Sequence, residues 1–291
     1  MLDVQKLIPK KLMSSLIGRL AKIAGGKLTY YTIKYYIIYF KVDMSESLEP
    51  NIRRFVTFND FFTRALKTAA RPQPSDPLQI ISPADGSVSQ CGHIEGQTLI
   101  QAKGISYSLI DLFEGDSSTA NLFRGGTFHT IYLAPNNYHR IHMPIAGSAL
   151  YLRYTSGNLF SVNEATVRSL PSLFCVNERA ALVFKSHHGF MALVMIGATN
   201  VGSIEFNFSE TSTFLNRPHC TFEEGMTHSI SSREFARGEE IGRFNMGSTV
   251  IMLTSKDLAT WTSFHSAESA IQVNSPLNGL IRNSSLTSSV Y

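Results

Sequence analysis

The sequence has few of the residues that stabilise a secreted protein or a metal centre. Only three cysteines occur among its 291 residues, and no two of them form a Cys-x-x-Cys pair: Cys91, Cys175 and Cys220. An odd and widely spaced set predicts neither a disulfide framework nor a zinc site. We therefore expect a protein of a reducing, cytoplasmic setting.

Long apolar runs are also missing. No stretch approaches the roughly 20 apolar residues that a membrane-spanning helix needs. Lys10, Lys11 and Arg19 interrupt the first apolar segment, which is not typical of a secretory signal. With 43% hydrophobic and only 16% charged residues, the chain is nevertheless rather apolar. We expect a folded protein that lies on a membrane without crossing it.

Acidic residues are absent from the N-terminal segment between Val4 and Val42. The basic residues of this segment are Lys6, Lys10, Lys11, Arg19, Lys22, Lys27, Lys34 and Lys41. Apolar residues recur at helical spacing from Leu7 to Ala24, and an aromatic segment at 28–40 follows Gly25-Gly26. Basic amphipathic helices with aromatic residues are typical of membrane surfaces. Two ordinary helices packed on a domain would give the same pattern.

The rest of the chain changes character twice. Thr57 to Asp60 resembles a capping box that opens a short helix through Lys67, and a proline-rich linker follows. From residue 78 short β-rich runs prevail, including 127–133, 182–184, 190–196 and 248–253. We predict an α+β protein, with amphipathic helices and linker in 1–77, a mainly antiparallel β catalytic domain in 78–282, and a disordered tail in 283–291.

Gly247-Ser248 interrupts an apolar run and could be a place where the backbone reacts. A serine hydroxyl can attack the carbonyl that precedes it, and glycine leaves that approach uncrowded. The resulting ester can eliminate, and hydrolysis of the dehydroalanine yields a pyruvoyl group, which serves as an electron sink for amines. The same dipeptide also suits a bulge or close packing in a strand.

Three further side chains suggest acid–base chemistry. Asp85 lies in an Asp-Gly turn, and His139 and His142 stand three residues apart before Pro144. A His-x-x-His pair could be half of a metal site, but no cluster of ligand residues completes one. Ser, His and Asp are also the residues of a serine hydrolase. No Gly-x-Ser-x-Gly motif occurs, which argues against the α/β-hydrolase class.

Five motifs in order carry a family resemblance. They are Phe58-Asn-Asp-Phe-Phe-Thr-Arg64-Ala-Leu-Lys67, Ser82-Pro-Ala-Asp-Gly86, Tyr138-His-Arg-Ile-His-Met-Pro144, Gly197-Ala-Thr-Asn-Val-Gly202 and Gly238-Glu-Glu-Ile-Gly-Arg-Phe-Asn-Met-Gly-Ser-Thr249. Together they resemble phosphatidylserine decarboxylase of the bacterial membrane-associated type, from about residue 4 to about residue 258. Met246 replaces the leucine usual in that family, and the segment after Trp261 matches poorly.

The resemblance implies a proenzyme that cuts itself between Gly247 and Ser248. The products are a β chain, 1–247, and an α chain, 248–291, that begins with a pyruvoyl group derived from Ser248. The resemblance makes Asp85, His142 and Ser248 the self-cleavage set, with His142 as base and Asp85 holding its tautomer and orientation. It assigns protonation of the substrate carbanion to His139. Neither a metal nor an external cofactor is implied.

The implied reaction converts phosphatidylserine into phosphatidylethanolamine and CO2 through a Schiff base with the pyruvoyl group. The implied location is peripheral, on anionic lipid at the cytoplasmic face of the cell membrane. The implied partners are phosphatidylserine and the two chains of one precursor; a homodimer is left open, and no nucleic acid is expected. Two alternatives are a pyruvoyl enzyme for a soluble amino acid and a non-catalytic lipid-binding protein.

Three other positions are interpreted structurally. The segment 197–202 is predicted to form a packed turn in the core of the site, because no P-loop Lys-Ser/Thr follows it. His187-His188 is expected in an exposed turn. Arg64 and Lys67 could meet a lipid phosphate, but we predict a solvated helix face for both.

Overall fold

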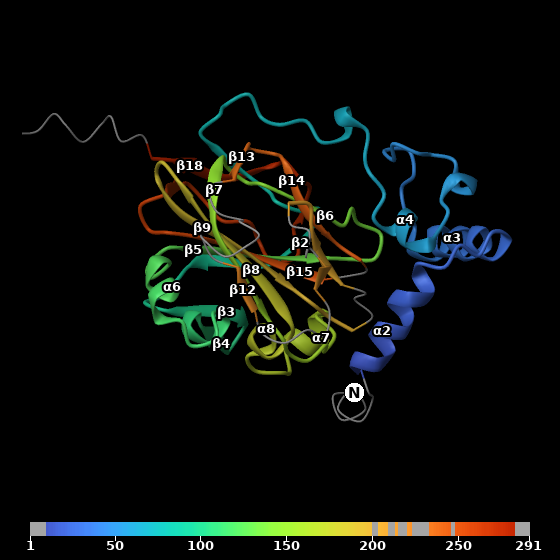
Figure 1. Cartoon of the computed structure of the whole chain (residues 1–291). Helices are drawn as coiled ribbons and strands as arrows, with labels where there is room; N and C mark the ends of the chain where they lie inside the picture. The colour runs from blue at the N-terminus through green and yellow to red at the C-terminus, as the bar shows by residue number, and fades with distance from the viewer. Residues whose placement is uncertain are drawn as a thin grey trace, which may run out of the picture.

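The computed structural model describes residues 10–199, 203–208, 213–214, 220–222, 233–245 and 248–282. Gly247 and the tail predicted to be disordered at 283–291 lie outside the described residues. Figure 1 shows a group of helices beside a body of β-sheets. The predicted mixed fold with N-terminal helices and mainly antiparallel sheets is confirmed. The domain boundary at residue 77 stays a prediction.

The helical part begins with α2 (Lys10–Ala21) and α3 (Lys27–Phe40). The predicted capping box is confirmed, because the Thr57 hydroxyl accepts from the Asp60 N–H while the Asp60 carboxylate accepts from the Thr57 N–H. It opens α4 (Phe58–Phe62), which ends well before Lys67, so the predicted length was wrong. The 3-10 turns η1 (Ile52–Arg54) and η2 (Thr68–Ala70) complete the region. Within the described residues, no helix has the length and apolar character to cross a bilayer.

Aromatic side chains attach α3 and α4 to the β-sheet body. The Tyr36 ring contacts Phe58, Phe61 and Phe62 edge to face, and its hydroxyl donates to the Pro135 carbonyl oxygen at 3.0 Å. Buried aromatic pairs add directional contact to the area they remove from water. The position of α3 is therefore tied to the loop that contains Pro135.

Among the described residues the main sheet has nine strands, and its pairs are antiparallel. Its order is β12 (Cys220–Phe222), β7 (Gly147–Thr155), β8 (Arg179–Ser186), β9 (Gly189–Ile196), β15 (Ser248–Thr254), β5 (Thr127–Leu133), β2 (Gly86–His93) and β17 (Ala270–Ile271), with β13 (Glu234–Phe235) pairing β7. The four runs predicted as strands correspond to β5, β8, β9 and β15 and are confirmed.

Three smaller sheets complete the body. They are β1 (Gln79–Ile81), β18 (Pro276–Ile281) and β16 (Ala259–Trp261); β11 (Thr213–Phe214), β10 (Ile204–Phe206), β14 (Glu240–Phe244) and β6 (Arg140–His142); and β3 (Thr98–Ala102) with β4 (Ile105–Ser108). Four short helices lie between strands: α5 (Leu109–Leu112), α6 (Ser117–Leu122), α7 (Glu164–Val167) and α8 (Leu173–Val176). Of the two histidines predicted in an exposed turn, His187 is exposed between β8 and β9, whereas His188 is half-buried there.

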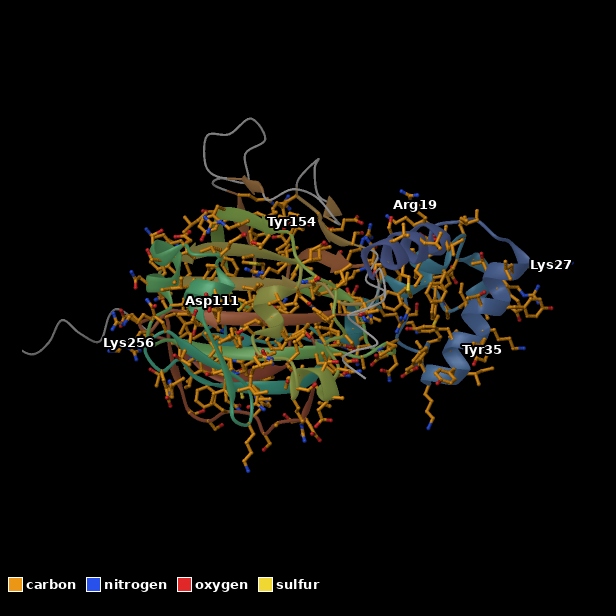
Figure 2. The ribbon with its side chains drawn as sticks, turned by 90° about the horizontal axis from the view of Figure 1, so that it is seen from below. Arg19, Lys27, Tyr35, Asp111, Tyr154 and Lys256 are labelled. Atoms are coloured by element: carbon orange, nitrogen blue, oxygen red, sulfur yellow. The ribbon has the colours of Figure 1, made fainter. Side chains whose placement is uncertain are left out.

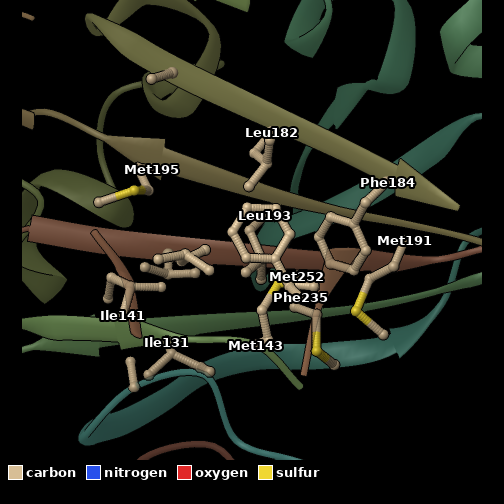
Figure 3. Close-up of a cluster of buried hydrophobic side chains, with 14 of the residues drawn as sticks. Ile131, Ile141, Met143, Leu182, Phe184, Met191, Leu193, Met195, Phe235 and Met252 are labelled. Carbon is tan, nitrogen blue, oxygen red and sulfur yellow. The ribbon is translucent and has the colours of Figure 1, made fainter. Parts of the chain in front are cut away.

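The central strand β15 is buried on both faces. Val250 and Met252 belong to one hydrophobic cluster, whereas Ile251 and Leu253 belong to another. Alternating side chains of a strand point to opposite faces, so a strand between two cores reads as a continuous apolar run. Figure 3 shows Met252 within the first cluster. This burial fixes the register that places Ser248 at the start of the strand, opposite Leu133.

The segment after Trp261, which the motifs left unassigned, is part of the fold. It supplies β17, which pairs β2, and β18, which lies between β1 and β16. Residues 248–282 therefore enter two different sheets. If the chain is cut after Gly247, these pairings would keep the two pieces together.

Candidate active site

Ser248 lies at the edge of a cavity of about 320 Å³. Its side chain is buried, and its Oγ has no hydrogen-bond partner in the part of the chain described. A buried hydroxyl usually finds a partner, so an unpartnered one next to a cavity suits a group that reacts or binds. The cavity is lined by Tyr36, Phe40, Phe62, Tyr132, Leu133, Pro135, Ser161, Val162, Asn163, Ala198, Thr199 and Ser248.

The cavity lies between the helical part and the β-sheet body. The helices α3 and α4 contribute Tyr36, Phe40 and Phe62, whereas the β-sheet body contributes the polar side chains of Ser161, Asn163 and Thr199. Thr199 belongs to the segment predicted as a packed turn in the site, of which residues 200–202 are outside the described ranges. A pocket with apolar walls and a few polar groups suits an amphiphilic ligand.

His139 lies behind one wall of this cavity. Its ring packs on Phe62 with the ring centres 4.1 Å apart, and it is fully buried. Nδ1 lies 2.9 Å from the Asn137 carbonyl oxygen, and Nε2 has no partner among the described residues. Burial, and secondarily the charge of Arg64, lowers the pKa of His139 to about 3, against the opposing hydrogen bond to Asn137. The imidazole is thus neutral, with Nδ1–H donating and Nε2 carrying the free lone pair.

His142 faces a different cavity of about 420 Å³, which is also lined by Arg71, Tyr138 and Gly238. Nδ1 lies 2.8 Å from the Gly238 carbonyl oxygen, and Nε2 lies 3.0 Å from the Tyr138 hydroxyl. Since a carbonyl only accepts, Nδ1 carries the proton and Nε2 accepts from Tyr138. Burial is the main cause of the lowered pKa of His142.

Asp85 is buried and held by an arginine that the sequence did not point to. Arg71 donates from Nε to Oδ1 at 2.9 Å and from a terminal nitrogen to Oδ2 at 2.5 Å. The Val273 N–H also donates to Oδ1 at 2.8 Å. The expected orienting bond from Asp85 to His142 is not formed, because both His142 nitrogens bond to other groups.

The four predicted site residues therefore fall into two pairs. His139 lies beside the Ser248 cavity, and Asp85 lies near the cavity that His142 lines. His139 directly precedes β6 and His142 is its last residue, so the three-residue spacing directs the two side chains to separate places, as strand geometry requires. In the described ranges, no group of three His, Cys, Asp or Glu side chains could hold a metal ion.

The predicted solvated helix face was wrong for Arg64, whereas Lys67 is exposed as predicted but lies beyond the end of the helix. Arg64 is only 5% exposed, and its guanidinium lies 5.5 Å from the centre of the Phe61 ring and donates to the Asn136 carbonyl oxygen at 3.3 Å. Lys67 Nζ donates to the Ser45 carbonyl oxygen at 2.6 Å. The helix ends at Phe62, so the chain turns and carries Arg64 inward instead of along a helix face.

Fold and site define a mainly antiparallel α+β protein with a cavity that suits an amphiphilic ligand. Beside the cavity are a buried serine and a buried histidine, and Ser248 Oγ and His139 Nε2 have no hydrogen-bond partner among the described residues. Comparison with known proteins identifies the group to which it belongs. The profile of the phosphatidylserine decarboxylase family matches residues 58–275.

Several curated proteins are similar over most of their length. The phosphatidylserine decarboxylase proenzyme of Shewanella sp. (strain W3-18-1) is 44% identical over 254 residues, covering 87% of this chain and 88% of that protein. The proenzyme of the same name from Shewanella baltica (strain OS155 / ATCC BAA-1091) is 42% identical over 271 residues, covering 93% of each chain. The chain belongs to the phosphatidylserine decarboxylase family, which confirms the resemblance inferred from its motifs. Membership implies a carboxy-lyase.

Proposed function

We propose that this chain is a precursor that matures into an enzyme converting phosphatidylserine into phosphatidylethanolamine and CO2, with its reactive carbonyl derived from Ser248. The observation that carries the proposal is the buried Ser248 Oγ at the start of the central strand, beside a cavity and with no hydrogen-bond partner among the described residues. The similar Shewanella proteins are named proenzymes, which supports maturation by cleavage.

Ser248 is the nucleophile of maturation in this proposal. Its Oγ attacks the Gly247 carbonyl carbon, and the peptide bond becomes an ester. Loss of the Ser248 Cα proton expels the Gly247 carboxylate, and hydrolysis of the dehydroalanine releases ammonia and leaves a pyruvoyl group on residue 248. Once formed, this group supplies an electron-withdrawing carbonyl to the substrate amine. The two pieces stay paired through β15, β17 and β18.

His142 is the base of maturation, and Asp85 supports it. Nδ1–H of His142 is fixed by the Gly238 carbonyl oxygen, so Nε2 is the atom that can take a proton. His142 and Ser248 line different cavities, so taking the proton of Ser248 requires Nε2 to release the Tyr138 hydroxyl and the two side chains to come together before cleavage. Burial lowers the pKa of His142, and the hydrogen bond to Gly238, the charge of Glu240 and, least of all, the charge of Asp85 oppose this and favour the protonated ring.

His139 moves the proton of turnover. Nε2 has no partner among the described residues and can receive a proton during turnover, and because burial lowers the pKa of His139 to about 3, the protonated ring gives that proton up readily. The same nitrogen can return this proton to the carbon that CO2 leaves. Phe62 covers the ring, which keeps bulk water from competing for that carbon.

The N-terminal helices suit a lipid surface. They expose large apolar side chains, namely Leu12, Leu16, Leu20, Ile23, Leu28, Tyr31, Tyr35, Ile38 and Tyr39. Exposed lysines stand among them at 22, 27, 34 and 41, and Figure 2 shows Arg19, Lys27 and Tyr35 at the helical end of the molecule. Because α3 also lines the Ser248 cavity through Tyr36 and Phe40, a lipid in the interface would lie next to the site. We place the enzyme peripherally on the cytoplasmic face of the cell membrane.

The lysines should make membrane binding dependent on salt. Replacing Lys22, Lys27, Lys34 and Lys41 by glutamine should weaken binding to phosphatidylserine vesicles on the order of 10²–10³-fold at low salt, since each contributes about 1 kcal/mol near an anionic surface. The matched control replaces four exposed cations of the β-sheet body, Lys103, Arg124, Lys185 and Lys256, by glutamine. Equal loss of vesicle flotation in both variants would contradict the proposed binding face.

Substrate choice separates this function from its two alternatives. The purified protein should convert phosphatidylserine in vesicles to phosphatidylethanolamine with release of CO2, and should leave free serine unchanged. The measurement is lipid headgroup analysis together with CO2 release. Preferential decarboxylation of the free amino acid would favour the soluble-substrate enzyme. Vesicle binding without CO2 release would favour a non-catalytic lipid-binding protein.

A further inference from the structure

Arg71 bridges two carboxylates from separate parts of the protein. It holds both oxygens of Asp85, and it donates to both oxygens of Glu46 at 2.9 and 2.8 Å. The side chains of Arg71 and Asp85 are 9% and 6% exposed, whereas that of Glu46 is 33% exposed. Hydrogen bonds to both partners raise the pKa of Arg71 against the opposing effect of burial, so its charge is permanent. A buried bidentate pair of this kind fixes orientation as well as charge.

The bonds to Asp85 leave a defined place for one more donor. A carboxylate has about four acceptor positions. Arg71 fills one on each oxygen, and the Val273 N–H fills a second one on Oδ1. The remaining position is on Oδ2. Arg71, Val273 and His142 line the same cavity, so Arg71 sets which atom of Asp85 stays available there.

Arg71 also contacts both of the pieces that the proposed cut after Gly247 would produce. The Asn274 side-chain amide donates to the Arg71 carbonyl oxygen at 2.8 Å, and Val273 bonds to Asp85. Residues 273 and 274 lie after the proposed cut, whereas Arg71 and Asp85 lie before it. Glu46 belongs to the segment between α3 and α4. Arg71 thus joins the helical region, the maturation site and the C-terminal piece.

We infer that Arg71 is a positioning residue for self-cleavage and acts through Asp85. The inference rests on the proposed function, in which Asp85 supports His142 during maturation. Without the guanidinium, the carboxylate keeps only the Val273 N–H and no longer has a fixed free position. Misplacement of a supporting group by about 1 Å can cost about 10²-fold in rate.

The test compares cleavage rates of the purified full-length chain. Arg71→Gln should slow the appearance of the two pieces by about 10²-fold, and Arg71→Lys should be intermediate, because an ammonium keeps the charge and loses the fork. The control is Arg54→Gln, which removes an exposed arginine paired with Glu49 and should leave the rate unchanged. Once slowly matured, the Arg71→Gln enzyme should show wild-type kcat and KM.

A double variant separates positioning from a general structural role. The incubation must be long enough to resolve slow cleavage. The double variant should then be cut no more slowly than Asp85→Asn alone, because Arg71 acts through the Asp85 carboxylate, which Asp85→Asn has already removed. A wild-type rate in Arg71→Gln, or equal slowing in both backgrounds, would overturn the inference. If Arg71→Gln does not fold, Arg71→Lys is judged by the same comparison. A wild-type rate in Asp85→Asn would instead remove Asp85 from maturation and overturn that part of the proposed function.

Discussion

Replacing Ser248 by alanine should leave one full-length chain of 291 residues with no decarboxylase activity. The methyl group cannot attack the preceding carbonyl, and without an ester on Cβ there is no leaving group whose elimination gives the dehydroalanine that water hydrolyses to the ketone. The loss should be complete, because maturation and turnover both depend on this side chain. A denaturing gel and release of CO2 from phosphatidylserine vesicles measure the two effects.

The control for this variant is Ser255→Ala. Ser255 follows the other end of β15, where its hydroxyl accepts from the Phe190 N–H at 3.0 Å. Loss of one such bond costs about 1 kcal/mol of stability and leaves the fold in place. Ser255→Ala should be cut and active. Two pieces in the Ser248→Ala sample would refute self-cleavage by this serine.

The two histidines should fail in opposite ways. His139→Ala should still be cut and carry the pyruvoyl group, yet decarboxylate about 10²–10⁴-fold more slowly, because the carbon that CO2 leaves lacks a positioned acid. His142→Ala should remain as precursor, because Ser248 lacks its base. Gel analysis, mass after hydride reduction and CO2 release distinguish the two defects.

The control for the two histidine variants is His187, in the exposed turn between β8 and β9. His187→Ala removes an imidazole that lies outside both cavities and should mature and turn over normally. If His139→Ala stays uncut while His142→Ala matures, the two roles are reversed. Normal maturation and turnover in both would make the histidine segment structural.

The strands were predictable where burial on both faces left a continuous apolar run. The predicted strand at 248–253 matches β15 except at its last residue, because a strand between two cores needs apolar side chains at successive positions. The end of α4 was not predictable from propensity. Leu66 and Lys67 have good helix propensity, but α4 ends before Thr63, and the Arg64 guanidinium packs against the Phe61 ring.

The sequence proposed a set of candidate site residues, but it did not predict how they are arranged. Motifs pointed to Ser248, His139, His142 and Asp85, and the three-residue spacing separates the two histidines on a strand, but nothing in the sequence says which cavity each side chain lies beside. Arg71 stands among the prolines of an apparent linker, where no pattern indicates a partner fourteen positions away. Such contacts depend on how the loops return to the sheet, which the local sequence does not encode.

The intact masses of the purified wild-type protein test the central claim most directly. Self-cleavage predicts two species, residues 1–247 and residues 248–291, with the shorter one lighter by one ammonia than a chain that begins with serine. Hydride reduction should add two hydrogens to the shorter species alone. A single species with the mass of the uncut chain, or a shorter piece that begins with unmodified serine, would contradict the account.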